Sequence, residues 1–431
     1  MKKPLLLIWC LLVGLAVIPK SAFAGGFELY EHDAKAAAMQ NAFVAQANTP
    51  SAIYYNPAGM TQLEGTQLLC GANFYFPSAT FESNGTSAFG AAGKKTDLET
   101  QTFIIPQLFV THKLNEDLSV GLGGFINFGL GTQWPTDWEG RYITGGTKAE
   151  VKTFTIEPAV AYRPIKQVSI GFGPFAEYFD VTLENKIPQT GAPATDLSSK
   201  LNGSSWQFGW NLGVLVWITD ELKFGANYRS SAKQSISGNA EITGTALSPV
   251  TQAILGKYDA EADITLPPIG NFGLAYEKQD WTVEADLYWT GWTTYDKLAV
   301  TIKNFPAGNP DPISKNWKDT WAYRFGGEYR MDETWSFRAG FSLEKSPIPA
   351  TTLDPLMPSG DRRYYSLGVG AKFDLLTVDL AYIYLTDDAG KFDNEVADYA
   401  TEFGKPPLGR MTGKFQDVTA HILCVNLRYQ L

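Results

Sequence analysis

Fourteen segments of this chain alternate apolar and polar side chains with a period of two, and they are rich in Phe, Tyr, Trp and Val. A period of two places successive side chains on opposite faces of a β-strand. The segments are about ten to fifteen residues long, enough for a tilted strand to cross a bilayer. The even number is typical of bacterial single-chain barrels, so the pattern predicts an all-β fold, a fourteen-stranded antiparallel transmembrane β-barrel. The expected strands are residues 66–76, 101–113, 118–130, 150–163, 168–182, 204–217, 222–236, 261–276, 281–295, 320–330, 335–344, 364–373, 377–385 and 419–431.

The connections between these segments alternate between short turns and long loops. Short turns fall at residues 114–117, 164–167, 218–221, 277–280, 331–334 and 374–376, and long loops at 77–100, 183–203 and 386–418, among others. This alternation is typical of transmembrane barrels, in which the short turns are periplasmic. We therefore expect residues 66–431 to form a barrel in the outer membrane of a Gram-negative cell, with both termini in the periplasm. A soluble sandwich or propeller is the alternative, but such folds lack strands of this length and regularity.

The alternation also assigns a face to each side chain. A closed barrel in lipid has only a lipid face and a lumen face, so the apolar parity of each strand is expected to face lipid. An alternating hydrophobic last strand also suits recognition by the barrel-assembly machinery during biogenesis. In that strand the apolar parity is Leu423, Val425, Leu427, Tyr429 and Leu431, and the polar parity includes Asn426, Arg428 and Gln430.

Two cysteines follow the N-terminal region, one on the first expected strand and one on the last. Cys70 shares the parity of Leu68 and Phe74 and is expected to face lipid. Cys424 shares the parity of Asn426 and is expected to face the lumen. Side chains on opposite faces cannot reach disulfide geometry, so we predict two free thiols.

The first 24 residues have the pattern of a secretory signal peptide. Lys2 and Lys3 form a basic start, residues 5–18 are apolar, and residues 22–24 form a small-x-small cleavage site. The apolar stretch is too short for a bilayer-spanning helix, and Pro19 and Lys20 follow it. We expect cleavage after residue 24.

The composition excludes some classes of function. Loss of the three lysines in residues 1–24 changes the formal net charge from −10 to −13. An acidic, aromatic-rich chain is not expected to bind nucleic acid, and three histidines give little material for a metal site. No later stretch approaches 18 uninterrupted apolar residues, so helical membrane spans are not expected.

Residues 25–65 precede the first expected strand and have no strand pattern. Residues 32–46 are rich in Ala and compatible with a short helix, and the segment carries few charges. Low charge and good helix formers disfavour a disordered tail. We therefore expect a plug, or hatch, folded into the barrel lumen.

Asn56-Pro57-Ala58, shortly before the first expected strand, begins a series of sequence runs that resembles the FadL/TodX family of outer-membrane transporters. Each run is weak alone, but together they occur in order and cover essentially the whole chain after the signal peptide. The other runs are Leu201-Asn202-Gly203, Trp206-Gln207-Phe208-Gly209-Trp210-Asn211, Tyr228-Arg229-Ser230, Leu266-Pro267, Trp317-Lys318-Asp319, Trp335-Ser336-Phe337-Arg338-Ala339-Gly340 and Ser346-Pro347-Ile348-Pro349.

The resemblance implies passive uptake of hydrophobic molecules, above all long-chain fatty acids, with neutral aromatic or aliphatic hydrocarbons as the alternative. It implies capture among outer loops, a deeper binding pocket, and lateral exit through a gap where the third strand bends inward. The hatch and gating residues are then Phe27, Asn56, Pro57 and Ala58, and the lateral opening is Asn127, Phe128, Gly129 and Leu130.

The glycines of the third expected strand agree with a bend. Gly123, Gly124 and Gly129 lie in this strand, and glycine within a strand often marks a bulge. A tight barrel corner is the other explanation for the same glycines.

The residues that contact the substrate are harder to identify from the sequence. Members of the family have basic residues near the carboxylate, but the region after the fifth expected strand reads Asp180-Val181-Thr182-Leu183-Glu184. The second basic position falls near Ile313, so the candidates are Lys315 and Lys318, with Ile126 as an apolar contact. On an outer loop, Val250, Ile254 and Leu255 have helical spacing. They form either a capture groove or packing between loops.

We expect no catalysis, cofactor or metal, because His32, His112 and His421 are scattered and no Gly-x-Ser-x-Gly elbow occurs. A barrel lipase, a general porin and an adhesin are the other classes considered. A lipase needs a His at the mouth of the lumen, and a porin lacks a plug of forty residues. We expect a monomer surrounded by outer-membrane lipid and lipopolysaccharide.

Overall fold

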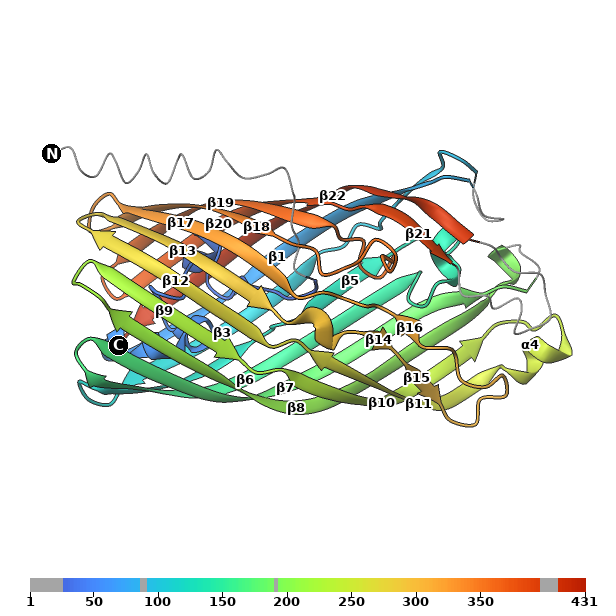
Figure 1. Cartoon of the computed structure of the whole chain (residues 1–431), viewed down its shortest axis with the longest axis horizontal. Helices are drawn as coiled ribbons and strands as arrows, with labels where there is room; N and C mark the ends of the chain where they lie inside the picture. Colours follow the sequence, from blue (N-terminus) through green and yellow to red (C-terminus); the bar gives the residue numbers. More distant parts are fainter. Residues whose placement is uncertain (1–25, 86–90, 190–192, 396–409) are drawn as a thin grey trace.

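The computed structural model describes residues 26–85, 91–189, 193–395 and 410–431. They form a closed, antiparallel β-barrel whose first and last strands pair with each other (Figure 1). The expected signal peptide lies outside the described residues, as does part of the loop expected at 386–418. None of the helices in the described ranges is long and apolar enough to span a membrane.

The wall of the barrel has fourteen strand positions, three of which are occupied by two consecutive strands (β4 and β5, β9 and β10, β11 and β12). This confirms the expected fold. The long strands are β1 (Thr66–Ser83), β3 (Phe103–Lys113), β4 (Leu118–Phe125), β5 (Gly129–Gln133), β6 (Lys148–Ile165), β7 (Val168–Ile187), β8 (Leu197–Trp217), β9 (Leu222–Arg229), β10 (Ala232–Thr243), β11 (Gly256–Leu266), β12 (Ile269–Lys278), β13 (Trp281–Thr290), β17 (Thr320–Arg330), β18 (Trp335–Glu344), β19 (Asp361–Phe373), β20 (Leu376–Asp388) and β22 (Arg410–Gln430).

Shorter elements lie at the ends of the wall and inside the barrel. The short strands are β2 (Lys95–Asp97), β14 (Lys297–Leu298), β15 (Val300–Ile302), β16 (Ile313–Ser314) and β21 (Lys391–Glu395). The helices are α2 (Ala34–Ala38), α3 (Ala52–Tyr55) and α4 (Pro249–Ala253), and the 3₁₀ helices are η2 (Pro57–Gln62), η3 (Glu139–Tyr142), η4 (Pro193–Thr195) and η5 (Trp292–Thr294).

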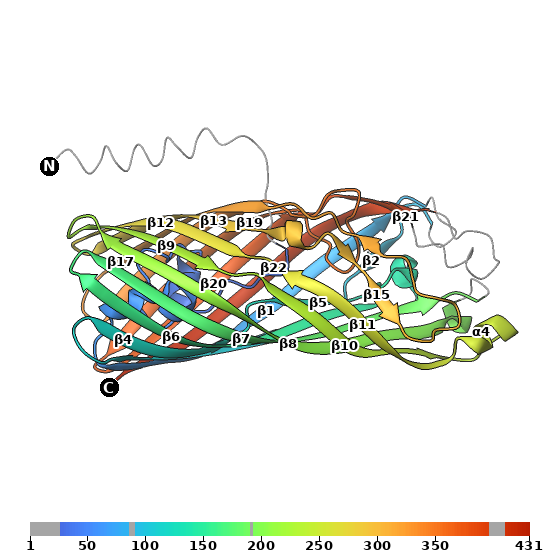
Figure 2. The ribbon, with the colours of Figure 1, turned by 60° about the horizontal axis from the view of Figure 1, so that its bottom comes forward.

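The two ends of the barrel differ as the connection lengths predict. Figure 2 shows the short hairpin turns and the C-terminus at one end, and α4 with the long loops at the other. The Leu431 amide donates to the carbonyl of Thr66, beside the turn that follows β3. At the loop end the strands run well past their expected limits: β1 extends to Ser83 and β8 begins at Leu197.

Three strands that were expected to be continuous are interrupted, and one of them, expected at 118–130, breaks at residues 126–128. The strand expected at 222–236 breaks between Arg229 and Ala232, and the strand expected at 261–276 breaks at Pro267 and Pro268. Proline cannot donate to a ladder, so two adjacent prolines end the pairing. Beyond the break β10 pairs with β8 and β11, whereas β9 pairs with β8 and β12.

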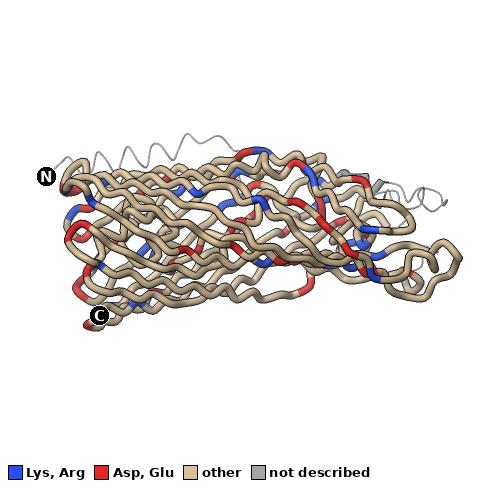
Figure 3. Tube along the Cα trace, turned by 90° about the horizontal axis from the view of Figure 1, so that it is seen from below, with Lys and Arg blue, Asp and Glu red and all other residues tan. Residues whose placement is uncertain are grey.

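Side chains alternate between lipid and lumen along the wall as expected. In β22, Leu423, Leu427 and Tyr429 are exposed on the outer face, whereas Asn426 is buried. Charged residues also occur in the middle of the barrel (Figure 3), and several of them pair inside. Arg338, for example, contacts Glu328 at 2.5 Å and Asp379 at 2.6 Å.

Residues 26–65 lie in the lumen, in the half nearer the short turns (Figures 1 and 2). We call them the N-terminal segment. Its helices are shorter than the helix expected at 32–46, because only Ala34–Ala38 is helical and the following residues form turns. Inward-facing side chains bind its backbone: the amides of Phe43 and Ala45 donate to Asp286 at 3.0 Å and to Glu284 at 2.6 Å.

The cysteines provide a test of the register. Cys70 is opposite Leu427 and half-buried on the outer face, whereas Cys424 is opposite Asn73 and buried against the N-terminal segment. Both are free thiols.

In native barrels a membrane-permeant maleimide should label Cys70 and leave Cys424 unlabelled until the barrel is unfolded, as measured by peptide mass spectrometry. Labelling of Cys424 in the native state would contradict this register.

Candidate functional site

The wall is interrupted at its third strand position. β4 ends at Phe125 and β5 begins at Gly129, and both pair with β6. Three residues, 126–128, lie between β4 and β5, whereas only two, 153 and 154, lie between the partners Lys152 and Thr155 on β6. One extra residue on one of two paired strands is characteristic of a β-bulge. On the other side, β3 pairs with β4 only from Leu108 onward, so residues 103–107 have no partner at this position. The ladder between β3 and β5 is therefore missing.

The N-terminal segment pairs with the interrupted strand from inside. The Leu29 amide donates to the carbonyl of Asn127, and the Gly129 amide donates to the carbonyl of Phe27, each at 2.9 Å. The Thr153 hydroxyl of β6 contacts both the amide and the carbonyl of Phe128. These bonds satisfy backbone groups that the missing ladder would leave unpaired. The bend and the N-terminal segment are thus joined through main-chain hydrogen bonds.

A wide cavity of about 680 Å³ lies at this interruption. It is lined by lumen-facing residues of β6, such as Val151 and Thr153, and also by residues of the outer face of the wall. Ile104 and Phe154 belong to that outer face and are 60% and 41% exposed. A cavity that touches both faces extends through the wall.

One aromatic side chain covers part of the interruption. Phe103, at the start of β3, lies against Gly131 of β5, and a Cβ atom at Gly131 would be 2.0 Å from its ring. Only a residue without a side chain leaves room for the ring there.

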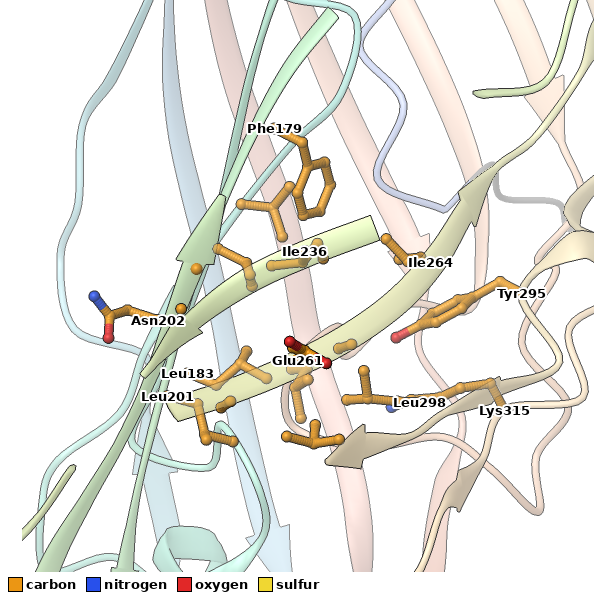
Figure 4. Close-up of a pocket in the computed structure, with 18 of the residues that line it drawn as sticks. Phe179, Leu183, Leu201, Asn202, Ile236, Glu261, Ile264, Tyr295, Leu298 and Lys315 are labelled. Carbon is orange, nitrogen blue, oxygen red and sulfur yellow. The ribbon is translucent and has the colours of Figure 1, made fainter. Parts of the chain in front are cut away.

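A second, narrow cavity of about 90 Å³ lies next to the wide one. Figure 4 shows apolar side chains of several strands around one space, among them Ile236 and Ile264, with Tyr295 and Lys315 at one edge. Phe27, Val151 and Met357 line both cavities, so they form the partition between them. An apolar space with few polar groups suits a hydrophobic ligand.

Lys315 is buried at the edge of the narrow cavity, where it forms an ion pair with Asp354. Its Nζ atom also lies 6.0 Å from the centroid of the Tyr295 ring. Burial lowers the pKa of Lys315, but the Asp354 carboxylate and the Tyr295 hydroxyl together raise it above its ordinary value. Lys315 is therefore charged, and its charge is already matched by a carboxylate of this chain.

The other expected site residues are distributed more widely. Ile126 and Gly129 line the wide cavity, and Phe128 packs against Phe27. Lys318 is exposed and lines neither cavity. On α4 and the residues after it, Val250 is exposed, whereas Ile254 and Leu255 pack with Ile187, Leu197 and Ile242 of neighbouring loops and strands. Of the two roles expected for Ile254, a capture groove or packing between loops, its position favours packing between loops. The remaining expected residue, Leu130, pairs through its backbone with Val151.

Asn56, Pro57 and Ala58 lie against the barrel wall. The Asn56 amide donates to the carbonyls of Val44 at 2.8 Å and Val214 at 3.0 Å. Glycines of the wall leave room for this contact: a Cβ atom at Gly213 would be 2.1 Å from the Asn56 Oδ1 atom.

Sequence analysis missed Phe103, Met357 and Arg362, all of which line the wide cavity. Phe103 lies near the start of an expected strand and carries no signal of its own. Met357 lies in a long loop without periodicity, and Arg362 lies at the start of β19, two residues before the strand was expected to begin. Within the described residues, no group of three His, Cys, Asp or Glu side chains is arranged to hold a metal ion.

A fourteen-stranded barrel with apolar cavities in its lumen defines a class of protein, the outer-membrane transporters of hydrophobic compounds. Residues 15–431 match the family described as outer membrane protein transport protein (OMPP1/FadL/TodX). The chain belongs to this family and is an outer-membrane transporter of hydrophobic compounds.

Individual relatives agree with this assignment. A putative outer membrane protein of Neisseria meningitidis is 27% identical over 87% of this chain and 89% of its own length. The long-chain fatty acid transport protein of Escherichia coli K12 is 25% identical over 91% and 94%. Among solved structures, a Pseudomonas aeruginosa FadL homologue has a TM-score of 0.82 at 18% identity, covering 94% of this chain and all of its own. The Pseudomonas putida toluene transporter TodX has a TM-score of 0.69 at 16% identity, covering 95% and 100%.

Asn56 offers a direct test of how the N-terminal segment is attached. Asn56→Ala removes the two hydrogen bonds that this side chain donates and the one that its Oδ1 accepts from the Ala58 amide, each worth about 1 kcal/mol. Amide hydrogen exchange of residues 43–62 should therefore become on the order of 100-fold faster. Exchange in β18 and the heat-resistant migration of the barrel should stay unchanged. Unchanged exchange at residues 43–62 would show that this side chain does not hold the segment.

Proposed function

We propose that this protein takes up long-chain fatty acids and releases them sideways into the outer membrane. A substrate is captured at the outer loops, binds in the narrow cavity, passes the partition of Phe27, Val151 and Met357, and enters the wide cavity. It leaves between β3 and β5, at Asn127, Phe128, Gly129 and Leu130. The observation that carries the proposal is the wide cavity, which is lined by residues of both faces of the wall.

The contents of the lumen support a lateral route over an axial one. The N-terminal segment acts in this proposal as the hatch, residues 25–65. Its backbone is bound by Glu284, Asp286 and Asn426 of the wall, and Lys35 contacts Glu328 at 3.5 Å. An axial path requires these buried bonds to break together, and each buried group left unpaired costs about 1–3 kcal/mol. Along the lateral path, a substrate has to displace mainly side chains and few buried backbone hydrogen bonds.

Lateral release also suits the chemistry of the substrate. An apolar chain that moves from the cavity into the bilayer never enters water, and each CH₂ group exposed to water costs about 0.8 kcal/mol. Ile104 and Phe154, two large outward residues at the opening, are apolar. An acyl chain therefore remains in contact with apolar surface along this path.

A neutral aromatic or aliphatic hydrocarbon is the second candidate substrate. The observation in its favour is the Lys315–Asp354 ion pair, which leaves the narrow cavity without a free cation among the described residues that line it. TodX, whose fold this chain shares, is a toluene transporter of Pseudomonas putida. The two substrates are separated by binding assays with a fatty acid and with a hydrocarbon of equal chain length.

Gly129 is the position that tests the lateral route. A Cβ atom there would be 2.9 Å from Leu29 Cδ1, the mobile end of a side chain, so substitution is tolerable. Gly129→Phe should fill the opening and reduce fatty-acid uptake at least about tenfold, a loss equivalent to about 1.4 kcal/mol. Uptake is measured with a radiolabelled fatty acid in cells that contain equal amounts of folded barrel.

The matched control is Gly327→Phe in β17, where an added Cβ atom has no neighbour closer than 3.8 Å. It places the same bulk on the outer face, away from the opening, and should transport normally. Gly368 is unsuitable as a control, because its Cβ atom would be 2.4 Å from Ala38 of the N-terminal segment. Normal uptake by folded Gly129→Phe would make an axial path the better account.

A further inference from the structure

Arg362 is a cation of the wide cavity. It lies at the start of β19 with its side chain on the lumen face, and that side chain is 16% exposed. Its Nε atom donates to Asp387 Oδ2 of β20 at 3.1 Å. The other basic residue that lines this cavity, Lys152, is on the outer face of β6 and contacts Glu150 at 2.9 Å.

Asp387 has little capacity left for Arg362. Its Oδ1 atom accepts from the Gly360 amide at 2.6 Å, and its Oδ2 atom also accepts from the Ser359 hydroxyl at 2.8 Å. The contact with Arg362 is therefore a single bond through Nε and not a two-bond fork. Within the described residues, the terminal nitrogens of Arg362 have one contact, 3.5 Å from Nη1 to the Tyr364 hydroxyl. Glu344 is opposite in the ladder but accepts from Tyr30 and forms no ion pair with Arg362. The terminal edge of the guanidinium is thus available for a carboxylate.

Lys315 in the narrow cavity does not offer a substrate carboxylate such an edge of donors. It is buried between its own carboxylate partner, Asp354, and the ring of Tyr295. Among the described residues, three cations therefore line the two cavities: Lys152 on the outer face, the buried Lys315, and Arg362 on the lumen face. Of these, only Arg362 presents a planar edge of donors to the lumen that can bind a carboxylate through two bonds.

The acidic residues of the wide cavity do not exclude a carboxylate. Burial raises the pKa of Glu28 to about 8, so this residue is protonated at neutral pH. Burial also raises the pKa of Glu31. Glu150 is held between Lys148 at 3.3 Å and Lys152 at 2.9 Å. Asp387 is the remaining acid in the lining, and three donors already bind it.

One segment of the chain connects Arg362 to the narrow cavity. Asp354 and Leu356 line the narrow cavity, Met357 lines both, and Ser359 and Arg362 line the wide one. Four residues lie between Met357 and Arg362, so their Cα atoms are five steps along the chain and at most about 17 Å apart. A long acyl chain with its head at Arg362 can therefore reach the partition and enter the apolar space beyond it.

We infer that Arg362 binds the carboxylate of the substrate in the wide cavity, with the acyl chain directed through the partition into the narrow cavity. This inference rests on the proposed function and adds to it a head-group ligand and an orientation. The bound head then lies beside the lateral opening. The binding energy has two sources, a charge-assisted fork at Arg362 and apolar burial around Ile236 and Ile264.

Affinity measurements on the purified full chain test the head-group ligand. The probes are a 16-carbon fatty acid and its methyl ester, which has the same chain without the charge. Arg362→Gln combined with Asp387→Asn removes the ion pair without leaving a buried charge. It should weaken binding of the acid about tenfold to hundredfold, the effect of a charge-assisted bond, and leave binding of the ester within about twofold.

The matched control is Lys315→Gln combined with Asp354→Asn, which removes the equivalent pair from the narrow cavity and should not change the acid-to-ester ratio. Asp387→Asn alone frees the whole guanidinium and should tighten binding of the acid several-fold. An unchanged ratio in the Arg362 double variant, or a loss in the Lys315 double variant instead, overturns the inference. If the parent protein binds neither acid nor ester, the proposed function fails as well.

The orientation is tested on the unaltered protein, so it does not depend on the folding of a variant. A fatty acid with a photoreactive diazirine at its methyl end is bound, irradiated and located by peptide mass spectrometry. Labels should appear in β7 and β8 around Leu183 and Leu201, which line the narrow cavity. Labels at Ile104 or Phe154 of the wide cavity instead mean that the head lies at Lys315, and they overturn the inference.

Discussion

Backbone hydrogen bonding in lipid is the constraint on which this structure depends. A strand in a bilayer must pair on both edges, because no water is present to satisfy its amides and carbonyls. The barrel satisfies its edge strands by pairing β1 with β22. The exception is the gap between β3 and β5, where the two strands do not pair. Over residues 103–107 the ladder is absent, and the interrupted strand bends to pair with Phe27 and Leu29 inside the lumen. The break in the wall and the N-terminal segment are therefore parts of one arrangement.

This arrangement links the opening to the interior of the barrel. Phe27 lies in the partition between the cavities, and its carbonyl also accepts from Gly129 in the bent strand. A ligand that displaces the Phe27 ring acts on residues bonded to the edge of the opening. Phe103 covers the opening from the other side through its contact with Gly131. On the proposed path, these two aromatic side chains, Phe27 and Phe103, are two points at which the wide cavity can be closed without a moving domain.

The sequence predicted most of the wall because lipid and lumen impose a period of two. The faces of β22 and the free thiols of Cys70 and Cys424 follow from that pattern. The bend close to Gly129 was expected from the family resemblance and from the glycines of the third strand. The breaks at Ser230–Ser231 and Pro267–Pro268 were missed, although the parity of the buried residues changes across each of them and the two prolines were a usable signal. Two residues of the wide cavity could not be predicted, Met357 in the loop before β19 and Arg362 at the start of β19. The path of that loop depends on packing with distant strands. The sequence could not decide whether Ile254 belongs to a capture groove or packs between loops, because its neighbours Ile187 and Leu197 lie far away in the sequence.

The central claim is that substrate leaves between β3 and β5, and a reversible cross-link tests it most directly. Phe103→Cys and Gly131→Cys are combined in a background with Cys70→Ser and Cys424→Ser, and the pair is bridged by a reducible bifunctional thiol reagent. Bridging of Gly327→Cys to Ala339→Cys, which are opposite each other in the intact ladder of β17 and β18, is the control. The account predicts that fatty-acid uptake is lost when 103 and 131 are bridged, returns on reduction, and is unaffected in the control. Uptake at the unbridged rate through a fully bridged 103–131 pair would contradict it.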